Sequence, residues 1–160
     1  MSITGQKFSR RVILQGAGTV ALVGLGSTAF GWPAFADNDK YPAEAFKQKT
    51  DAEAVKLLYG KTAEASDKIK LDAPEIAENG AVVPVSVTTT LADVSSISFL
   101  VADNPNVLIA SYKIPAGTVP AVANRIKMAK TSKVTVLVEA GGKLYSTSKE
   151  VKVTVGGCGG

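Results

Sequence analysis

The residue best suited to chemistry is the single cysteine, Cys158, which lies third from the end of the 160-residue chain. Glycine pairs flank it on both sides, namely Gly156, Gly157, Gly159 and Gly160. The chain contains no histidine, which excludes a zinc site of the Cys/His type and any Ser-His-Asp or Cys-His catalytic arrangement. With one cysteine, no intramolecular disulfide can form. We therefore expect no metal site and no catalytic residue.

The chemistry that remains for Cys158 is covalent attachment. No neighbouring side chain favours the thiolate, and the C-terminal carboxylate two residues on disfavours it. Five extended residues reach about 16–18 Å, and glycine adds only backbone width while adopting φ/ψ values closed to other residues. The tail, residues 156–160, is thus predicted to be a swinging arm that carries a thiol into the narrow cleft of another protein. That other protein, an enzyme, would activate the thiol, since a mobile arm cannot hold a near-attack geometry.

The N-terminal segment indicates export. Arg10 and Arg11 precede a glycine-rich, moderately apolar stretch, and the segment ends in the small-x-small sequence Ala34-Phe35-Ala36. This pattern predicts a cleaved twin-arginine (Tat) signal peptide over residues 1–36, with an ordinary secretory signal as the alternative. We expect a periplasmic protein with no membrane attachment after cleavage. An idle exposed thiol would be a liability in an oxidising compartment, which disfavours an incidental cysteine.

The charge balance argues against nucleic acid as a partner. The net charge is +4, but the first 36 residues contribute Lys7, Arg10 and Arg11 and no acid. The rest of the chain is nearly neutral, so it lacks the basic surface that binds a phosphate backbone.

The elements that must position the tail lie in one predicted domain, residues 37–155. Thr50 and Glu53 form a capping box that opens a helix ending at Gly60. A helical turn is expected over residues 42–49, and a linker over residues 61–68.

From Ile69 onward the apolar residues recur with period two, which is typical of half-buried strands. The alternating positions are Val83, Val85 and Val87; Ile97, Phe99 and Val101; Val122, Ile126 and Met128; Val134, Val136 and Val138; and Val151, Val153 and Val155. Pro84 suggests that its strand is an edge strand or contains a bulge.

Two glycine turns separate these segments. Asn79-Gly80 predicts a hairpin between residues 68–72 and 81–90, and Gly141-Gly142 predicts a tight hairpin before Leu144. About seven or eight short strands favour an immunoglobulin-like antiparallel β-sandwich with a short N-terminal helical segment and a flexible C-terminal arm. Glu75 and Glu78 are interpreted as a solvated turn, not as an acid/base pair.

Two stretches resemble one known family. The tail Val151–Gly160, VKVTVGGCGG, resembles the C-terminus of the SoxY family, the sulfur-carrier subunits of the Sox thiosulfate-oxidising system. The stretch Leu71–Val87, LDAPEIAENGAVVPVSV, resembles a second region of the same family. The leader and the helix before Lys61 also fit, and residues 125–145 match more loosely, so that the resemblance covers nearly the whole chain.

The resemblance implies a carrier and its partners. Cys158 would be the covalent sulfur site, and the sulfur adducts would take the place of a cofactor. SoxY-like proteins pair as heterodimers with SoxZ, a small β-sandwich protein without its own export signal, and SoxAX, a haem enzyme, joins thiosulfate to the tail cysteine. SoxB, a manganese hydrolase, then releases sulfate, and a sulfane dehydrogenase, where present, oxidises the remaining sulfur.

Three other functions remain open from the sequence. Ubiquitin-like sulfur carriers also end in Gly-Gly but use a C-terminal thiocarboxylate, which requires adenylation in the cytoplasm and conflicts with the export signal. An exported structural or adhesive β-sandwich would have no sulfur role and would keep an unmodified thiol. Catalysis by the chain itself is the least favoured.

Overall fold

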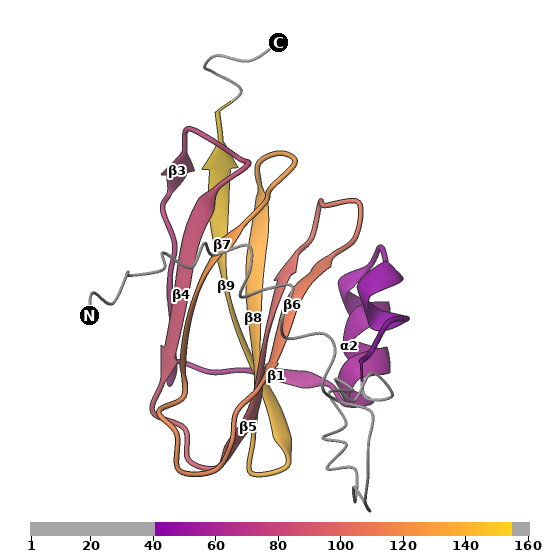
Figure 1. Ribbon diagram of the computed structural model, residues 1–160, viewed down its shortest axis with the longest axis vertical. Coiled ribbons are helices and arrows are strands. Elements are labelled where there is room, and N and C mark those ends of the chain that lie inside the picture. Colours follow the sequence, from indigo (N-terminus) through magenta and orange to yellow (C-terminus); the bar gives the residue numbers. More distant parts are fainter. Residues whose placement is uncertain (1–40, 155–160) are drawn as a thin grey trace, which may run out of the picture. The chain divides into compact units, whose positions relative to one another are not determined.

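The computed structural model describes residues 41–154, which form two β-sheets and a short helical segment (Figure 1). The larger sheet has the strand order β1-β9-β8-β5-β6, with β3 also paired to β9, and the smaller has the order β2-β4-β7. The strands are β1 (Ala63–Ala65), β2 (Ile69–Asp72), β3 (Ile76–Ala77), β4 (Val83–Thr89), β5 (Val94–Val101), β6 (Leu108–Lys113), β7 (Ala121–Ile126), β8 (Ser132–Ala140) and β9 (Lys143–Val153). The signal residues Arg10 and Arg11, Cys158 and the predicted arm 156–160 lie outside the described residues.

The helical segment begins as the capping box predicts. A 3₁₀ turn, η2 (Ala45–Lys47), precedes the helix α2 (Asp51–Tyr59). The Thr50 Oγ1 accepts a hydrogen bond from the backbone N–H of Glu53 at 3.4 Å, and the Glu53 carboxylate accepts one from the Thr50 hydroxyl at 2.7 Å. Gly60 ends the helix with φ +62°, in the left-handed region where glycine costs least.

The two sheets pack face to face, as expected for a mainly β sandwich. The core between them takes the alternating apolar residues of both sheets, among them Val85, Phe99, Val136 and Val151, each of which is buried. The outer face of the larger sheet is covered as well. There Leu58 and Tyr59 of α2 pack on a second apolar cluster that includes Leu100, Leu137 and Leu144. Strand β5 is consequently buried on both faces from Ser96 onward.

The position of strand β4 differs from the one predicted from Pro84. Its valines alternate as expected, with Val83, Val85 and Val87 buried, but β4 is the central strand of its sheet and not an edge. Its pairing with β2 stops at Asp72–Ser86, whereas its pairing with β7 continues to Val83. Pro84 therefore lies past the end of β2, where a missing N–H costs no ladder hydrogen bond on that side.

Of three further predictions about connections, one was wrong, one was right in part and one was confirmed. The expected linker 61–68 contains β1, which pairs in parallel with β9. The predicted pairing of residues 68–72 with 81–90 is present, as antiparallel β2 and β4. The tight turn at Asn79-Gly80 is absent, because the connection between the two strands contains β3, which pairs in parallel with the end of β9. The hairpin at Gly141-Gly142 is present: it joins β8 to β9 with φ values of +54° and +76°, as a two-residue turn requires.

Candidate functional site

The last described strand, β9, ends where the predicted arm begins. Its ladder with β8 closes at the pair Ser132–Val151, yet the strand continues for two residues, to Val153. These final residues are the base of the arm, because Cys158 follows Val153 by five positions. How these residues are held therefore bears on where the predicted arm starts.

One edge of this base is held by a side chain. Thr131 immediately precedes β8, and its Oγ1 accepts a hydrogen bond from the backbone N–H of Val153 at 2.9 Å. The same hydroxyl donates to the carbonyl oxygen of Val153 at 3.5 Å. The Thr131 hydroxyl thus continues the ladder past the point at which the two backbones separate.

The other edge is held by β3. Ile76 and Ala77 pair in parallel with Lys152 and Val153. The N–H of Lys152 donates to the Glu75 carbonyl at 2.9 Å, and the N–H of Thr154 donates to the Ala77 carbonyl at 3.1 Å. Successive N–H groups of a strand point to opposite sides, and here the three from Lys152 to Thr154 are all bonded.

The segment around β3 is itself fixed at both ends. Lys149 of β9 donates from Nζ to the carbonyl of Ala73 at 2.6 Å. At the other end, the Gly80 carbonyl accepts from the N–H of Met128 at 2.7 Å. A Cβ on Gly80 would lie 2.5 Å from the Met128 carbonyl oxygen and 2.9 Å from Cγ1 of Val153, so that only glycine fits. The glycine of the Asn-Gly pair serves this close approach and not a two-residue hairpin.

The sequence predicted one part of the candidate site and missed another. Cys158, Gly156, Gly157, Gly159 and Gly160 lie outside the described residues, so their place in the site stays a prediction. Thr131, Lys149 and the pairing of β3 with β9 were not predicted, and the sequence carried a signal only for the β3 segment, through the resemblance of residues 71–87 to a family. Glu75 and Glu78 are exposed, in agreement with the solvated-turn interpretation.

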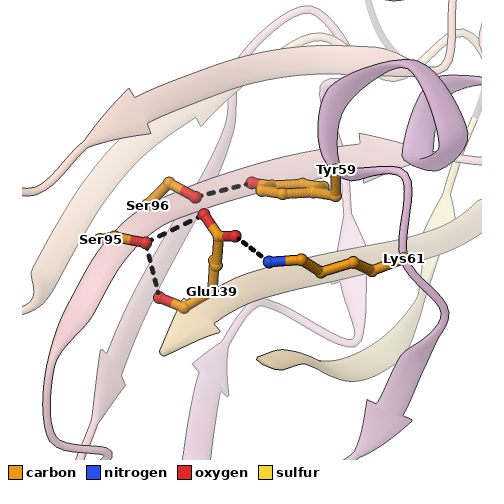
Figure 2. Close-up of polar contacts among 5 residues, drawn as sticks. All are labelled: Tyr59, Lys61, Ser95, Ser96 and Glu139. Carbon is orange, nitrogen blue, oxygen red and sulfur yellow. Dashed lines mark hydrogen bonds and ion pairs between the residues drawn. The ribbon is translucent and has the colours of Figure 1, made fainter. Parts of the chain in front are cut away.

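A second polar cluster lies beside the C-terminal end of α2 (Figure 2). Lys61 Nζ contacts a carboxylate oxygen of Glu139 at 2.7 Å, and Ser95 Oγ donates to the other oxygen at 2.9 Å. The hydrogen bond from Lys61 is the main cause that holds the pKa of the Glu139 carboxyl below its ordinary value, with burial acting in the opposite direction. An ionised carboxylate with a lysine and a serine on its oxygens forms a cross-link and is not poised to accept a proton.

The tyrosine of this cluster, Tyr59, also has a structural role. Its hydroxyl lies 2.7 Å from Ser98 Oγ and accepts from Ser96 Oγ at 3.1 Å, and Ser98 donates to Ser111 at 2.9 Å. These contacts satisfy the hydroxyl groups that β5 buries under α2. In residues 41–154 no group of three or more Asp, Glu, His or Cys side chains is placed to hold a metal ion.

Comparisons with known proteins agree with the resemblance seen in the sequence. The family model "Sulfur oxidation protein SoxY" matches residues 55–158. The solved structure of the sulfur carrier protein SoxY from Chlorobium limicola f thiosulfatophilum is 41% identical, with a TM-score of 0.60, and the match covers 65% of this chain and 96% of that one. No curated protein sequence matches the chain.

A more distant likeness concerns the fold alone. The superoxide reductase (neelaredoxin) of Ignicoccus hospitalis is 18% identical, with a TM-score of 0.50, over 57% of this chain and 95% of that one. Separately, among the described helices none is long and apolar enough to span a membrane.

The family match decides what kind of protein this is. It extends over more than half of the chain and includes both the described β-sandwich and the position of the lone cysteine. The match also covers almost all of the 41% identical structure, and that protein is described as a sulfur carrier and not as a catalyst. The chain therefore belongs to the SoxY family, the carrier proteins of sulfur oxidation.

Proposed function

We propose that this chain is an exported carrier that holds thiosulfate-derived sulfur covalently on Cys158 and presents it to partner enzymes on the arm 156–160. The observation that carries the proposal is the family match, which ends at residue 158, the position of the only cysteine. The bonded base of the arm supports it, because a carrier must offer its cargo from a defined point. The glycines would give the arm the narrow width that a deep active site demands.

The proposed chemistry begins with an oxidation at the thiol. A SoxAX-like haem enzyme would join the Cys158 sulfur to the terminal sulfur of thiosulfate, forming one S–S bond. The thiol proton is released, and two electrons pass to the haem enzyme. The product is a cysteine S-thiosulfonate with one net negative charge.

The second step is a hydrolysis. A SoxB-like hydrolase would add water to the terminal sulfonate group and break its S–S bond, which releases sulfate and two protons and leaves a persulfide anion on Cys158. A sulfane dehydrogenase, where present, would oxidise that remaining sulfur. None of these steps requires a catalytic residue from the carrier.

The proposal also includes a location and a stable partner. The Tat-type signal over residues 1–36, with Arg10 and Arg11, would export the folded chain to the periplasm. A SoxZ-like subunit without its own signal would form a heterodimer with the chain and leave the cytoplasm with it. This would explain why a protein without a recognisable cofactor site uses a pathway for folded proteins.

The test is the substitution Cys158→Ser in the heterodimer, assayed with thiosulfate, the haem enzyme and the hydrolase of the same organism. We expect sulfate release to fall to the level without carrier, while the circular dichroism spectrum and thermal midpoint stay those of the wild type. Sulfate release at the wild-type rate would contradict the proposal. If the sulfur were carried as a thiocarboxylate on Gly160, the Cys158→Ser variant would still carry it. If the protein were structural or adhesive, even the wild type would not support sulfate release.

A further inference from the structure

The Thr131 hydroxyl lies where the β8–β9 edge of the larger sheet changes from backbone pairing to side-chain pairing. The ladder of β8 with β9 ends at Ser132–Val151, and the next contact on that edge is the pair of bonds between Thr131 Oγ1 and Val153. From this geometry we infer that Thr131 is a positioning residue for the carrier arm. Its hydroxyl fixes the end of β9, from which the predicted arm starts. The inference rests on the proposed function.

The contacts on the opposite edge do not replace this hydroxyl. β3 binds the N–H groups of Lys152 and Thr154, which point away from β8. The N–H of Val153 points toward β8, and the contact it makes there is with Thr131 at 2.9 Å. Because β3 has only two residues, it is a weak support without a partner on the far edge. Loss of the Thr131 hydroxyl would therefore loosen both edges of the last β9 residues.

Fixing the base sets the reach of the thiol. Cys158 is the fourth residue after Thr154, so the free segment spans at most about 13–14 Å. If residues 152–154 detach, the free segment becomes longer by about 10 Å. A longer free segment must lose more conformational entropy when it is ordered inside an enzyme. The fixed base thus favours productive entry of the arm, whatever chemistry follows.

The experiment compares three variants of the heterodimer. Thr131→Val keeps the shape and removes the hydroxyl, and Thr131→Ser keeps a hydroxyl at the same position. Thr89→Val is the matched control, because Thr89 Oγ1 likewise accepts from a backbone N–H, that of Leu91 at 3.1 Å, and donates to a carbonyl, that of Lys68 at 2.9 Å. Thr89 ends β4, six residues beyond Val83, away from the base of the arm.

The first readout is hydrogen exchange at the Val153 amide, measured without cargo. Thr131→Val should exchange about tenfold faster there than the wild type, whereas Thr131→Ser and Thr89→Val should exchange at nearly the wild-type rate. The second is sulfate release by the hydrolase from thiosulfate-loaded carrier. For Thr131→Val we expect KM to rise about three- to tenfold with kcat nearly unchanged, and iodoacetamide to alkylate Cys158 at the wild-type rate.

A purely structural role would lower the thermal midpoint of Thr131→Val and Thr89→Val alike without a selective rise in KM. That result overturns the inference, as does unchanged exchange at Val153. If wild-type carrier loads and turns over but Thr131→Val has the KM of Thr89→Val, the inference fails and the proposed function stands. If wild-type carrier cannot be loaded with thiosulfate, the proposed function fails, and the inference fails with it.

Discussion

Two polar regions of the described chain are built in opposite ways. At the base of the arm, Lys152, Val153 and Thr154 are held through their backbone N–H groups, by β3 on one edge and Thr131 on the other. Beside α2, in contrast, the contacts join side chains, including the ion pair of Lys61 with Glu139 (Figure 2). Only the second region has the appearance of a catalytic site.

The difference between the two regions shows that ionisable groups need not mark the functional part of a carrier. The cluster beside α2 ties the loop after the helix to β5 and β8, so its ionisable groups are used for stability. The base of the arm contains no such cluster, yet in our proposal it governs how the Cys158 thiol is presented. Titratable groups alone would have pointed to the wrong region.

The largest expected effect comes from widening the arm. Gly157→Phe places a ring next to Cys158, so the arm should no longer enter a cleft shaped for glycine. We expect sulfate release to fall about 100-fold, as misplacement of reacting atoms commonly produces, while iodoacetamide still alkylates the thiol. Lys61→Met, in the other region, should leave sulfate release unchanged. Sulfate release at the wild-type rate with Gly157→Phe would show that the glycines do not serve to keep the arm narrow.

A moderate effect is expected at Gly80, where backbone and side chain crowd the position of a Cβ. Gly80→Ala should lower the free energy of unfolding by about 1–3 kcal/mol, because the contacts with Met128 and Val153 must give way. Urea titration measures this change, and faster hydrogen exchange at Val153 should accompany it.

Gly117→Ala is the control for Gly80→Ala. Gly117 has φ +82°, and a Cβ added there would meet no atom within 4 Å, so alanine costs about 1–2 kcal/mol of backbone strain. Hydrogen exchange at the Val153 amide should stay at the wild-type rate in Gly117→Ala. Equal exchange in the two variants would show that Gly80 does not support the base of the arm.

The smallest effect is expected from the ion pair beside α2. Lys61→Met should lower the free energy of unfolding at pH 7 by about 0.2–1 kcal/mol, the range for partly exposed pairs. Glu139 has a lowered pKa in the folded chain, so the stabilisation is complete above its ordinary value of 4.5 and is lost as the pH falls through the folded pKa.

The wild type and Lys61→Met should therefore converge in stability well below pH 4.5. Urea titrations at neutral and acidic pH measure this, and Lys127→Met, which removes a lysine outside the cluster, should show no such convergence. A difference that persists or grows in acid would contradict the assigned role of the pair.

The sequence was most informative where a local rule determines structure. The capping box at Thr50, the helix end at Gly60 and the turn at Gly141-Gly142 each follow from a few neighbouring residues, and the structure confirms them. The alternation of apolar residues likewise predicted the sandwich core, because burial of one face imposes period two. Composition alone also singled out Cys158 as the candidate reactive residue, which stays a prediction because it lies outside the described residues.

Long-range pairing was what the sequence could not supply. β1 and β3 have three and two residues, too few for an alternation, and both become strands only because β9 offers a free edge. Pro84 suggested an edge strand or a bulge, because the sequence does not reveal where β2 stops. Thr131 gave no signal, since its role depends on Val153, which lies 22 residues further along the chain.

The central claim is that Cys158 carries sulfur, and mass spectrometry tests it most directly. Trypsin cleaves after Lys152, so the last peptide is Val153–Gly160, which contains the only thiol. In protein purified from cells growing on thiosulfate, we predict reductant-labile sulfur or thiosulfonate adducts on this peptide and on no other. An unmodified Cys158 in actively sulfur-oxidising cells would contradict the account.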